Sequence, residues 1–357
     1  MDIDSKVSLV AKPPTEEIVT LEDLRSLFQS RTSPSHYIGF EISGLLHLGT
    51  IVISGYKLRD MMQAGIKATV FLADWHSVIN KKLGGDWERI KEASKYYEEA
   101  FSAFVPGVNI VLGSDLYAKE ADYWKNVIEF SSHVSLARAT RTLTIMGRSM
   151  KESLDIAQFF YPSMQAVDIH TLNAEIAHAG IDQRKVHMLA REVYPKMGWK
   201  PPVAVHHAIL LGLSKPERSG LEEDAESDLI ISGKMSKSKP KSAIFIHDST
   251  EEIYSKIASA WCPVGEVRLN PILQYAKLIV FHDSDEFRVE REKKFGGDIV
   301  YGSYEELEKD YLQRKIHPAD LKQSVAREID KVISPLRARF EGRKERIVEL
   351  FADKDGK

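Results

Sequence analysis

Between residues 37 and 211 the chain alternates short apolar runs with longer amphipathic runs. The short runs predict buried strands, and the longer runs carry apolar residues at the spacing of one helix face. Strands are expected over residues 37–41, 68–73, 108–112, 174–179 and 202–211, and helices over 51–64, 86–104 and 184–197, with one earlier helix over 21–29. Because strands that alternate with helices pair in parallel, the predicted fold is an α/β, Rossmann-like, doubly wound parallel sheet.

Two departures from this alternation divide the chain. Between residues 117 and 165 the strands disappear while helical periodicity continues, which predicts a helical insertion in the sheet domain. Residues 248–251, Asp-Ser-Thr-Glu, read as a capped helix start, and the remainder is mostly helical and rich in charge. The polar, acidic stretch 215–232 reads as a loop or small excursion. We therefore expect a Rossmann-like catalytic domain over 1–245 and a mostly α-helical domain over 246–357.

The charge balance and the cysteine count narrow the class of protein. With 49 basic and 52 acidic residues the net charge is −3, so a nucleic-acid surface would have to be a local basic patch. The single cysteine, Cys262, cannot form an internal disulfide or a multi-thiolate metal site, and it reads as a small buried apolar group. No segment approaches about 20 uninterrupted apolar residues, and residues 1–14 lack the apolar core of a signal peptide. We therefore expect a cytoplasmic protein without a membrane segment.

Two short motifs predict a nucleotide site. His47, Gly49 and Thr50 follow a predicted strand and open a predicted helix, where a phosphate meets free backbone N–H groups and the helix dipole. Far along the chain, residues 234–238 read Lys-Met-Ser-Lys-Ser, which offers two ammonium groups and two hydroxyls to a polyphosphate. Each motif has a plainer alternative, since the first can satisfy a strand–helix turn and the second can be a solvated loop. Their joint presence favours the nucleotide site.

A polar stripe on a predicted helix indicates a second ligand. Tyr161, Gln165 and Asp168 are spaced by four and three residues, so on a helix they share one face. The same segment carries three large apolar residues, Phe159, Phe160 and Met164. They make the helix apolar enough to be buried, which argues against the alternative of a solvated surface bearing three polar groups.

Asp74 and His76 stand at the end of the predicted strand 68–73. In open α/β sheets, ligands bind at the carboxyl ends of the strands. The two side chains therefore either line a pocket there or simply terminate the strand, and the sequence leaves both possibilities open.

These motifs resemble the signatures of a known enzyme family. In order, separation and spelling, residues 47–50 and 234–238 resemble the HIGH and KMSKS signatures of class I aminoacyl-tRNA synthetases. Together with the segments 37–41, 161–168 and 180–192, they resemble tyrosyl-tRNA synthetases of the archaeal and eukaryotic type over most of the chain. The sequence departs from that pattern at Thr50, where the last histidine of HIGH is replaced by a shorter hydroxyl donor.

The resemblance implies a two-step reaction. L-tyrosine and ATP would give tyrosyl-adenylate and pyrophosphate, and the tyrosyl group would then pass to the 3′ end of tRNA(Tyr). Mg2+ would accompany the ATP, held by phosphates and water, with no protein metal cage. The residues expected to bind ATP are Gly39, His47, Gly49, Thr50, Lys234, Ser236, Lys237 and Ser238. Four of these are expected to act in catalysis by stabilising phosphate charge, namely His47, Thr50, Lys234 and Lys237.

The resemblance also assigns the polar stripe to the amino-acid substrate. Tyr37 and Asp168 would hydrogen-bond the phenol, while Tyr161, Gln165 and Gln183 would hold the α-amino end. Phenylalanine would leave the buried carboxylate and hydroxyl unpaired, so rejection of that competitor needs no editing domain.

Contacts to RNA are implied in both halves of the chain. Arg184 and Lys185 would meet the acceptor end, and Phe295 would stack on the first anticodon base, with His317 and Asp320 reading its edge or its neighbour. The plainer alternatives are that Phe295 anchors a core beside a Gly-Gly turn, and that His317 begins a helix with Asp320 in its first turn. Three arginines of the insertion could also reach the RNA, although a solvated helix face is the default for them: Arg138, Arg141 and Arg148.

Other functions stay open at this point. A tryptophanyl-tRNA synthetase shares the fold and both nucleotide motifs, but an indole offers one donor and no acceptor to the Tyr37 hydroxyl. A non-catalytic RNA-binding paralogue would keep the scaffold, and Thr50 is the one feature in its favour. A small nucleotidyltransferase would leave the residues after 250 without a function. Family likeness also suggests a homodimer, with the helical insertion as its surface.

Overall fold

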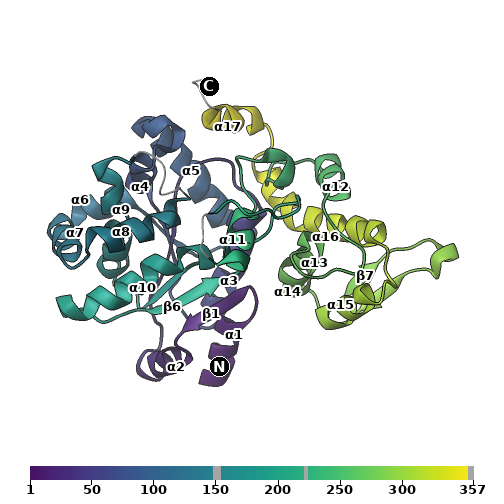
Figure 1. The fold of residues 1–357 in the computed structure, drawn as a ribbon, viewed down its shortest axis with the longest axis horizontal. Coiled ribbons are helices and arrows are strands. Elements are labelled where there is room, and N and C mark those ends of the chain that lie inside the picture. Colours follow the sequence, from purple (N-terminus) through teal and green to yellow (C-terminus); the bar gives the residue numbers. More distant parts are fainter. Residues whose placement is uncertain (148–153, 221–223, 353–357) are drawn as a thin grey trace. The chain divides into compact units, whose positions relative to one another are not determined.

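The computed structural model describes residues 1–147, 154–220 and 224–352, so the predicted RNA contact Arg148 lies outside the described residues. The chain divides into two compact units (Figure 1). Unit 1 comprises Met1–Gly44, Ser54–Ala208 and Ile347–Lys357, and unit 2 comprises Leu45–Ile53 and Ile209–Arg346. The expected domains over 1–245 and 246–357 are a division by function, and they stay a prediction.

Unit 1 is built on a six-stranded sheet in the order β1-β6-β5-β2-β3-β4. The strands are β1 (Thr15–Val19), β2 (His36–Phe40), β3 (Thr69–Leu72), β4 (Asn109–Leu112), β5 (Ile176–Gly180) and β6 (Val203–His207). Every neighbouring pair is parallel except β1 with β6. The five predicted strands are present as β2 to β6, and the predicted doubly wound sheet is confirmed. The sequence did not predict β1, because Glu16 and Glu17 interrupt the apolar pattern in this edge strand.

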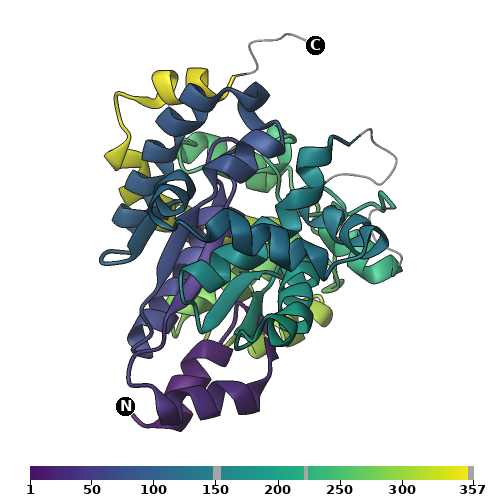
Figure 2. The same ribbon diagram turned by 90° about the vertical axis from the view of Figure 1, so that its left-hand side faces the viewer.

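Helices of unit 1 cover both faces of this sheet (Figure 2). They are α1 (Ile3–Ala11), α2 (Leu21–Ser30), α3 (Leu48–Gln63), α4 (Asp74–Ile79), α5 (Trp87–Phe104), α6 (Gly113–Lys119), α7 (Tyr123–Ser132), α8 (Leu136–Thr142), α9 (Ile156–Thr171) and α10 (Arg184–Val193), with α17 (Lys344–Phe351) near the C-terminus. Only the part of α3 from Ser54 onward belongs to unit 1, and α17 enters it at Ile347. All four predicted helices before residue 200 are therefore present, because their apolar residues recur at helical spacing.

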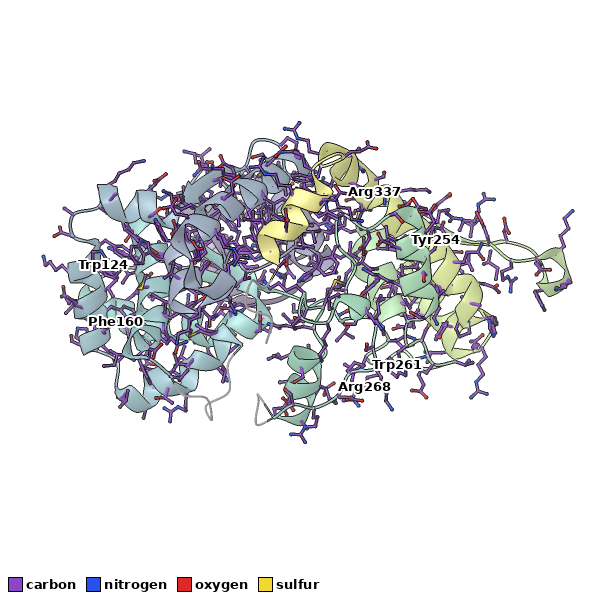
Figure 3. The ribbon with its side chains drawn as sticks, turned by 90° about the horizontal axis from the view of Figure 1, so that it is seen from above. Trp124, Phe160, Tyr254, Trp261, Arg268 and Arg337 are labelled. Atoms are coloured by element: carbon purple, nitrogen blue, oxygen red, sulfur yellow. The ribbon has the colours of Figure 1, made fainter. Side chains whose placement is uncertain are left out.

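Helices α6 to α9 form the predicted insertion between β4 and β5, with a 3-10 turn, η2 (Leu143–Met146), inside it. On α9, Met164 is fully buried as expected, but Phe160 is 40% exposed, so the expectation that Phe160 helps to bury the helix is wrong. Phe160 and Trp124, from α9 and α7, both lie at the outer side of the insertion (Figure 3). A single sequence pattern cannot tell a core face from a face that awaits another surface, since both are apolar.

The order of the strands fixes where a ligand should bind. From β2 the chain continues outward through β3 and β4, then returns to the other side of β2 as β5 and continues to β6. The topological switch point therefore lies between β2 and β5, and open α/β sheets bind ligands outside the carboxyl ends of the strands at such a point. Glu41 follows β2 and Gln183 follows β5, so both lie at this place.

Three buried histidines form a hydrogen-bonded chain across the middle of the sheet. His36 Nε2 lies 3.1 Å from His178 Nδ1, and His178 Nε2 lies 2.8 Å from His207 Nδ1. The Thr69 N–H donates to His36 Nδ1, which places the His36 proton on Nε2 and orders the other two tautomers in turn. Burial lowers the pKa of His36 to about 3 and that of His207 to about 4, so the chain is neutral at pH 7.

Unit 2 is mainly helical. Its elements are α11 (Ala225–Ser232), α12 (Thr250–Ala258), α13 (Pro271–Tyr275), a π-helical turn η6 (Ala276–Val280), α14 (Phe281–Asp283), β7 (Phe287–Val289), β8 (Ile299–Tyr301), α15 (Tyr304–Leu312) and α16 (Pro318–Arg339). Ser249 caps α12 in a reciprocal capping box with Glu252, which confirms the predicted helix start. The expected loop 215–232 instead contains α11, since Asp224 caps a helix there, and the hairpin β7–β8 was too short to be predicted.

Two expectations about the environment of the chain can be compared with the structure. Among the residues described, no helix combines the length and the apolar character needed to cross a bilayer. Cys262 is only partly buried, and its Sγ lies 3.2 Å from the Tyr311 hydroxyl and 3.6 Å from Asn270 Nδ2. The expectation that this cysteine is a small buried apolar group is therefore wrong.

Candidate active site

Helix α9 turns the predicted polar stripe into the interior of unit 1. Tyr161, Gln165 and Asp168 are 5, 8 and 0% exposed. The alternative that the stripe is a solvated helix surface is therefore wrong. A carboxylate, an amide and a phenol buried together need polar partners, and those partners define the site.

Two tyrosines hold one oxygen of Asp168. The hydroxyls of Tyr117 and Tyr123 donate to Asp168 Oδ1 over 2.9 and 2.8 Å, and their rings stack with centroids 3.9 Å apart. The other oxygen, Oδ2, makes no hydrogen bond within the protein. Burial raises the pKa of Asp168 well above its ordinary value, against the lowering effect of the two phenol donors. Sequence reasoning missed both tyrosines, although both lie within the predicted insertion, Tyr117 at its first residue.

Tyr37 lies on β2 with its ring buried against Phe71, at a centroid distance of 5.7 Å. Burial raises the pKa of Tyr37, and the negative charge of Asp168 raises it further, so the two groups share one environment. Gly39 is needed for this arrangement, because a Cβ built at that position would come within 2.3 Å of the Tyr37 hydroxyl oxygen. The structure thus gives Gly39 a steric part beside Tyr37, whereas its expected contact with ATP stays a prediction.

A carboxylate that the sequence reasoning did not assign completes the other end of the stripe. Glu41 Oε1 accepts hydrogen bonds from the Tyr161 hydroxyl at 2.8 Å and from Asn80 Nδ2 at 2.7 Å. Gln165 Nε2 lies 3.5 Å from Gln183 Oε1, while the Gln165 Oε1 atom makes no hydrogen bond within the protein. This end of the site therefore offers acceptor atoms of the kind that an ammonium group requires.

Asp74 and His76, which follow β3, have different surroundings. The Asp74 carboxylate accepts hydrogen bonds from the backbone N–H groups of Trp75 and Ser114, so it fixes the start of α6. His76 lies instead beside the polar stripe, edge-on to the Tyr161 ring with centroids 4.5 Å apart, and its Nε2 is 3.5 Å from Asp168 Oδ2. Burial lowers the pKa of His76 to about 4, so the imidazole is neutral at pH 7.

Several buried polar atoms of this site have no hydrogen-bond partner among the described residues. They are Asp168 Oδ2, Gln165 Oε1 and both ring nitrogens of His76. Folded proteins rarely leave buried donors or acceptors without a partner, because each costs free energy. The group therefore indicates a polar ligand with hydrogen-bonding atoms at both ends.

The first nucleotide motif lies in unit 2, at the start of α3. Leu48 N–H donates to Ile244 O, and the chain then turns into α3 with the N–H groups of Thr50 and Ile51 bonded to His47 O. The Thr50 hydroxyl lies 3.3 Å from His47 Nε2, and His47 Nδ1 is a buried atom without a hydrogen bond. Burial, together with the charges of Lys237 and Lys234, lowers the pKa of His47 to about 3.

The second motif, residues 234–238, forms a loop of unit 2 that we call the lysine loop. Met235 is buried, and its N–H donates to Leu210 O, while Gly212 N–H donates to Gly233 O on the neighbouring segment. The Ser236 and Ser238 hydroxyls lie 2.9 Å apart. Because both lysine charges act on His47, the structure brings the two predicted nucleotide motifs together within one unit.

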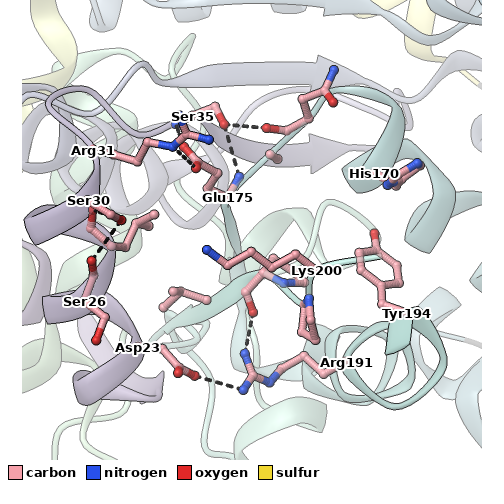
Figure 4. Close-up of a pocket in the computed structure, with 16 residues that line it drawn as sticks. Asp23, Ser26, Ser30, Arg31, Ser35, His170, Glu175, Arg191, Tyr194 and Lys200 are labelled. Atoms are coloured by element: carbon pink, nitrogen blue, oxygen red, sulfur yellow. Dashed lines mark hydrogen bonds and ion pairs between the residues drawn. The ribbon is translucent and has the colours of Figure 1, made fainter. Parts of the chain in front are cut away.

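A separate pocket of about 840 Å³ opens at the opposite end of the strands (Figure 4). Its lining includes Ser35, Glu175 and Pro202, which precede β2, β5 and β6. Here Arg31 Nε contacts Glu175 at 2.8 Å and Arg191 contacts Asp23 at 3.0 Å, so four of its charges are paired. This pocket lies at the amino ends of the strands and does not include any residue of the polar stripe.

The expected RNA contacts have different surroundings. Arg184 Nε pairs with Glu17 at 2.8 Å, and Lys185 Nζ donates to Thr144 Oγ1 at 2.9 Å. Phe295 is 59% exposed, with the Lys294 ammonium 4.9 Å from its ring centre, so the alternative that it anchors a core is wrong.

Two further expected RNA contacts lie at the start of α16. His317 is the N-cap residue, and its Nδ1 accepts the Ala319 N–H at 3.2 Å. Asp320 stands in the first turn. The plainer alternative for this pair therefore describes the local structure, and whether they also read a base stays a prediction. In the insertion, Arg138 pairs with Glu192 at 3.2 Å and Arg141 is exposed. In the described ranges, no three His, Cys, Asp or Glu side chains are grouped to hold a metal ion.

Comparison with known proteins places this geometry in a family. The chain matches the family model described as tRNA synthetases class I (W and Y) over residues 29–334. It is 48% identical to the tyrosine–tRNA ligase of Pyrococcus horikoshii over 360 residues, which cover 96% of each chain. Among solved structures, it is similar to the tyrosyl-tRNA synthetase of Pyrococcus horikoshii complexed with L-tyrosine, with a TM-score of 0.90 and 47% identity over 98% of this chain and 99% of that one.

The likeness extends to a second solved structure. The tyrosyl-tRNA synthetase of Archaeoglobus fulgidus, also complexed with L-tyrosine, has a TM-score of 0.84 and 38% identity over 95% of this chain and 99% of that chain. A family model that covers most of the chain and relatives of this identity over nearly the full length agree with each other. The chain belongs to the class I tRNA synthetases of the tryptophan and tyrosine group.

Proposed function

We propose that the protein is a tyrosine–tRNA ligase that activates L-tyrosine with ATP and transfers it to the 3′ end of tRNA(Tyr). The observation that carries the proposal is the buried polar stripe of α9, in which Asp168 Oδ2 makes no hydrogen bond within the protein while Oδ1 is held by two phenols. Relatives named tyrosine–tRNA ligase, at 47 to 48% identity over nearly the whole chain, support the same activity.

The proposed tyrosine site uses both ends of the stripe. The substrate hydroxyl donates to Asp168 Oδ2 and accepts from Tyr37, so both of its hydrogen-bonding functions are used. Its ammonium group lies among the acceptors of Tyr161, Gln165 and Gln183. A tryptophan indole would offer one N–H donor and no acceptor, which leaves the Tyr37 hydroxyl without a partner and makes tryptophan the weaker candidate.

In the first step the tyrosine carboxylate attacks the α-phosphorus of ATP, and the bond to the bridging oxygen of the leaving pyrophosphate breaks. Lys234 and Lys237 stabilise the charge that develops on the pyrophosphate, and the hydroxyls of Ser236 and Ser238 add hydrogen bonds. His47 is neutral because of its lowered pKa, and it acts as a hydrogen-bond donor to phosphate. Gly49 and Thr50 open α3, where the positive end of the helix dipole favours an anion. Mg2+ would accompany the ATP, held by phosphates and water, and would offset phosphate charge.

For the second step we propose that Arg184 and Lys185 contact the acceptor end of the tRNA. Phe295 stacks on an unpaired anticodon base, a contact that tolerates any base, while His317 and Asp320 supply selectivity through hydrogen bonds. The exposed ring of Phe295 and the cation beside it support this assignment. We place the reaction in the cytoplasm, a reducing compartment in which a single, unbridged cysteine is expected.

We also propose that the protein acts as a homodimer through the helical insertion. Helices α7, α8 and α9 expose five large apolar side chains: Trp124, Ile128, Leu136, Ile156 and Phe160. Trp124 and Ile128 are four residues apart on α7, as Ile156 and Phe160 are on α9, so each pair shares one helix face. An exposed apolar patch on neighbouring helices is typical of a protein interface.

Pyrophosphate exchange measured with each amino acid in turn tests the proposed function. We expect ATP–pyrophosphate exchange with L-tyrosine and none with phenylalanine at equal concentration. Exchange with tryptophan alone would assign the other specificity of the family, and no exchange with any amino acid would favour the non-catalytic paralogue. The oligomeric state is checked separately by sedimentation, where substitution of Ile128 by Asp should give monomers.

A further inference from the structure

A short antiparallel bridge holds the first nucleotide motif within unit 2. His47 lies directly opposite Phe245, which belongs to residues 243–248, here called the bridge segment. Two backbone hydrogen bonds flank the pair, at 3.0 Å from Leu48 N–H to Ile244 O and at 3.1 Å from Ile246 N–H to Leu46 O. In a pair flanked in this way the two side chains lie close together, and the His47 and Phe245 rings meet edge-on with centroids 6.4 Å apart. The position of His47 therefore depends on that of the bridge segment.

Lys256, on α12, ties the bridge segment together. Its Nζ donates to Ala243 O at 2.9 Å and to Asp248 Oδ2 at 2.6 Å, so it contacts the first and the last residue of the segment. The same ammonium group lies 5.0 Å from the centre of the Phe245 ring, and a cation over an aromatic ring is attracted by it. One side chain thus contacts the segment at both ends and at the residue that faces His47.

Asp248, the partner of Lys256, holds the backbone of Phe245. Its Oδ2 atom accepts the Phe245 N–H at 2.9 Å, and its own N–H donates to Phe245 O at 3.1 Å. The side chains of Lys256 and Asp248 are only 20 and 9% exposed. Breaking such a shielded ion pair costs more free energy than breaking an exposed one, because the remaining charge stays buried. The backbone and the ring of Phe245 are therefore both fixed by this pair.

Helix α16 holds the end of the bridge segment. Arg337 Nη1 donates to Asp248 O at 2.8 Å and to Asp330 Oδ1 at 2.9 Å, and Asp330 Oδ1 also accepts the Thr250 hydroxyl at 3.1 Å. These contacts attach the segment to the start of α12 and to α16. Arg337 reaches only the carbonyl at the end of the segment, however, whereas Lys256 contacts the Phe245 ring itself. The orientation of that ring therefore depends on Lys256 more than on Arg337.

We infer that Lys256 is a positioning residue for the first nucleotide motif, because it holds the bridge segment, and Phe245 within it, against His47. Each residue in this series of contacts belongs to unit 2. The inference rests on the proposed role of His47 in binding ATP. It extends that proposal by giving α12, which carries no residue of either nucleotide motif, a part in the first step of the reaction.

Steady-state pyrophosphate exchange with the full-length protein tests the role of Lys256. Lys256→Met keeps an apolar side chain but removes the ammonium group, so the KM for ATP should rise about three- to tenfold while the KM for tyrosine changes less than about twofold. The tyrosine KM is spared because no residue of the polar stripe belongs to the bridge segment. Lys256→Arg keeps a cation and should raise the KM for ATP less than Lys256→Met does. The control is Lys322→Met, since Lys322 also donates to a backbone carbonyl of α12, that of Ala258 at 2.9 Å, but not to the bridge segment. It should leave both KM values unchanged.

Hydrogen–deuterium exchange of the free protein separates this inference from the proposed function. Lys256→Met should increase exchange across residues 46–48 and 244–246, which form the bridge, while Lys322→Met should not. Asp248→Asn keeps an acceptor for the Phe245 N–H and removes the charge that Lys256 meets, so this milder variant should change both readouts in the same direction and decides the matter if Lys256→Met does not fold.

Three results would overturn the positioning role of Lys256: neither readout changes, the tyrosine KM rises as much as the ATP KM, or hydrogen–deuterium exchange increases evenly over the whole of unit 2. Failure of the wild-type protein to catalyse pyrophosphate exchange would overturn the proposed function instead. The hydrogen–deuterium result would still decide whether Lys256 orders the motif.

Discussion

Replacing Asp168 by Asn changes the one oxygen that we propose to sense the substrate hydroxyl. Tyr117 and Tyr123 both donate to Oδ1, so in the variant the amide oxygen takes that place and the NH2 group takes the place of Oδ2. The substrate phenol then meets a donor in place of an acceptor, and a charge-assisted hydrogen bond is lost or exchanged for a weaker neutral one. Such a change costs about 1–2 kcal/mol, or about 5- to 30-fold in kcat/KM for tyrosine.

Phenylalanine should respond in the opposite direction. In the wild-type site its ring would leave a buried carboxylate oxygen unpaired, which costs at least about 2 kcal/mol, and a neutral amide in that position costs less. The two effects together should reduce the preference for tyrosine over phenylalanine by more than the loss of about 5- to 30-fold that is expected with tyrosine alone. Tyrosyl-tRNA synthetases are themselves the general example of this discrimination, with a ratio of about 10⁵ that belongs to the family and is not worked out from this structure.

The assay is pyrophosphate exchange, with kcat/KM measured for tyrosine and for phenylalanine in the same preparation. Asp74→Asn is the matched control, because Asp74 is also a buried aspartate of unit 1 but bonds to the backbone of Trp75 and Ser114. It should lower stability and leave the ratio unchanged. An unchanged tyrosine-to-phenylalanine ratio in Asp168→Asn would refute the reasoning. That result would mean that burial keeps Asp168 protonated, so that the acid already donates a hydrogen bond to the substrate as an amide would.

Three further predictions concern other parts of the chain. Lys237→Ala should lower kcat for exchange at least 10-fold and leave the dissociation constant for tyrosine within twofold, since its charge acts on the leaving pyrophosphate; equal losses in both would contradict a transition-state role. The buried histidines should make the fold acid-labile. On folding, the pKa values of His36 and His207 fall from 6.5 to about 3 and 4, so the unfolded chain binds more protons than the folded chain below pH 6.5. As the pH falls from 6.5 to the folded pKa, each histidine should lower the free energy of unfolding by roughly 1.4 kcal/mol per pH unit. Urea unfolding at pH 7.5 and pH 5 checks the sign, and His178→Gln, which breaks the chain, should reduce the slope. Phe295→Ala should raise the KM for tRNA about 5- to 100-fold in aminoacylation without altering pyrophosphate exchange, whereas a loss of exchange would show that the ring serves the fold.

The sequence predicted the sheet well because β2, β3, β5 and β6 are largely buried along their length. Such strands read as short apolar runs bounded by turns, and all five were placed within a few residues of their observed bounds. The edge strand β1 and the hairpin β7–β8 escaped because they are short and carry charged residues, so packing and not local pattern decides them. Helix α11 escaped for a related reason, since its acidic, polar start is equally typical of a loop.

For the candidate site, helical spacing was enough to place Tyr161, Gln165 and Asp168 on one buried face of α9. It could not supply the partners of that face, because hydrogen bonds between distant segments leave no local pattern. Glu41 lies 120 residues from Tyr161 in the sequence, and its carboxylate accepts a hydrogen bond from the Tyr161 hydroxyl. The nucleotide motifs were found because a phosphate site needs particular residues close together in the sequence, which is the condition under which a short motif is informative.

The position of Tyr117 and Tyr123 gives the helical insertion a role beyond the surface that it exposes. Tyr117 belongs to α6 and Tyr123 begins α7, and both side chains reach back to Asp168 on α9. A carboxylate with one oxygen saturated by two donors can turn only the other oxygen to a ligand, so its direction is fixed before the substrate arrives. Fixing it in advance spares the site the entropy of ordering a side chain on binding. The first two helices of the insertion therefore hold the carboxylate of the proposed tyrosine site, while the outer faces of α7 and α9 carry the apolar residues that we propose for the dimer. A substitution that loosens α7 should accordingly weaken amino-acid discrimination and dimerisation together.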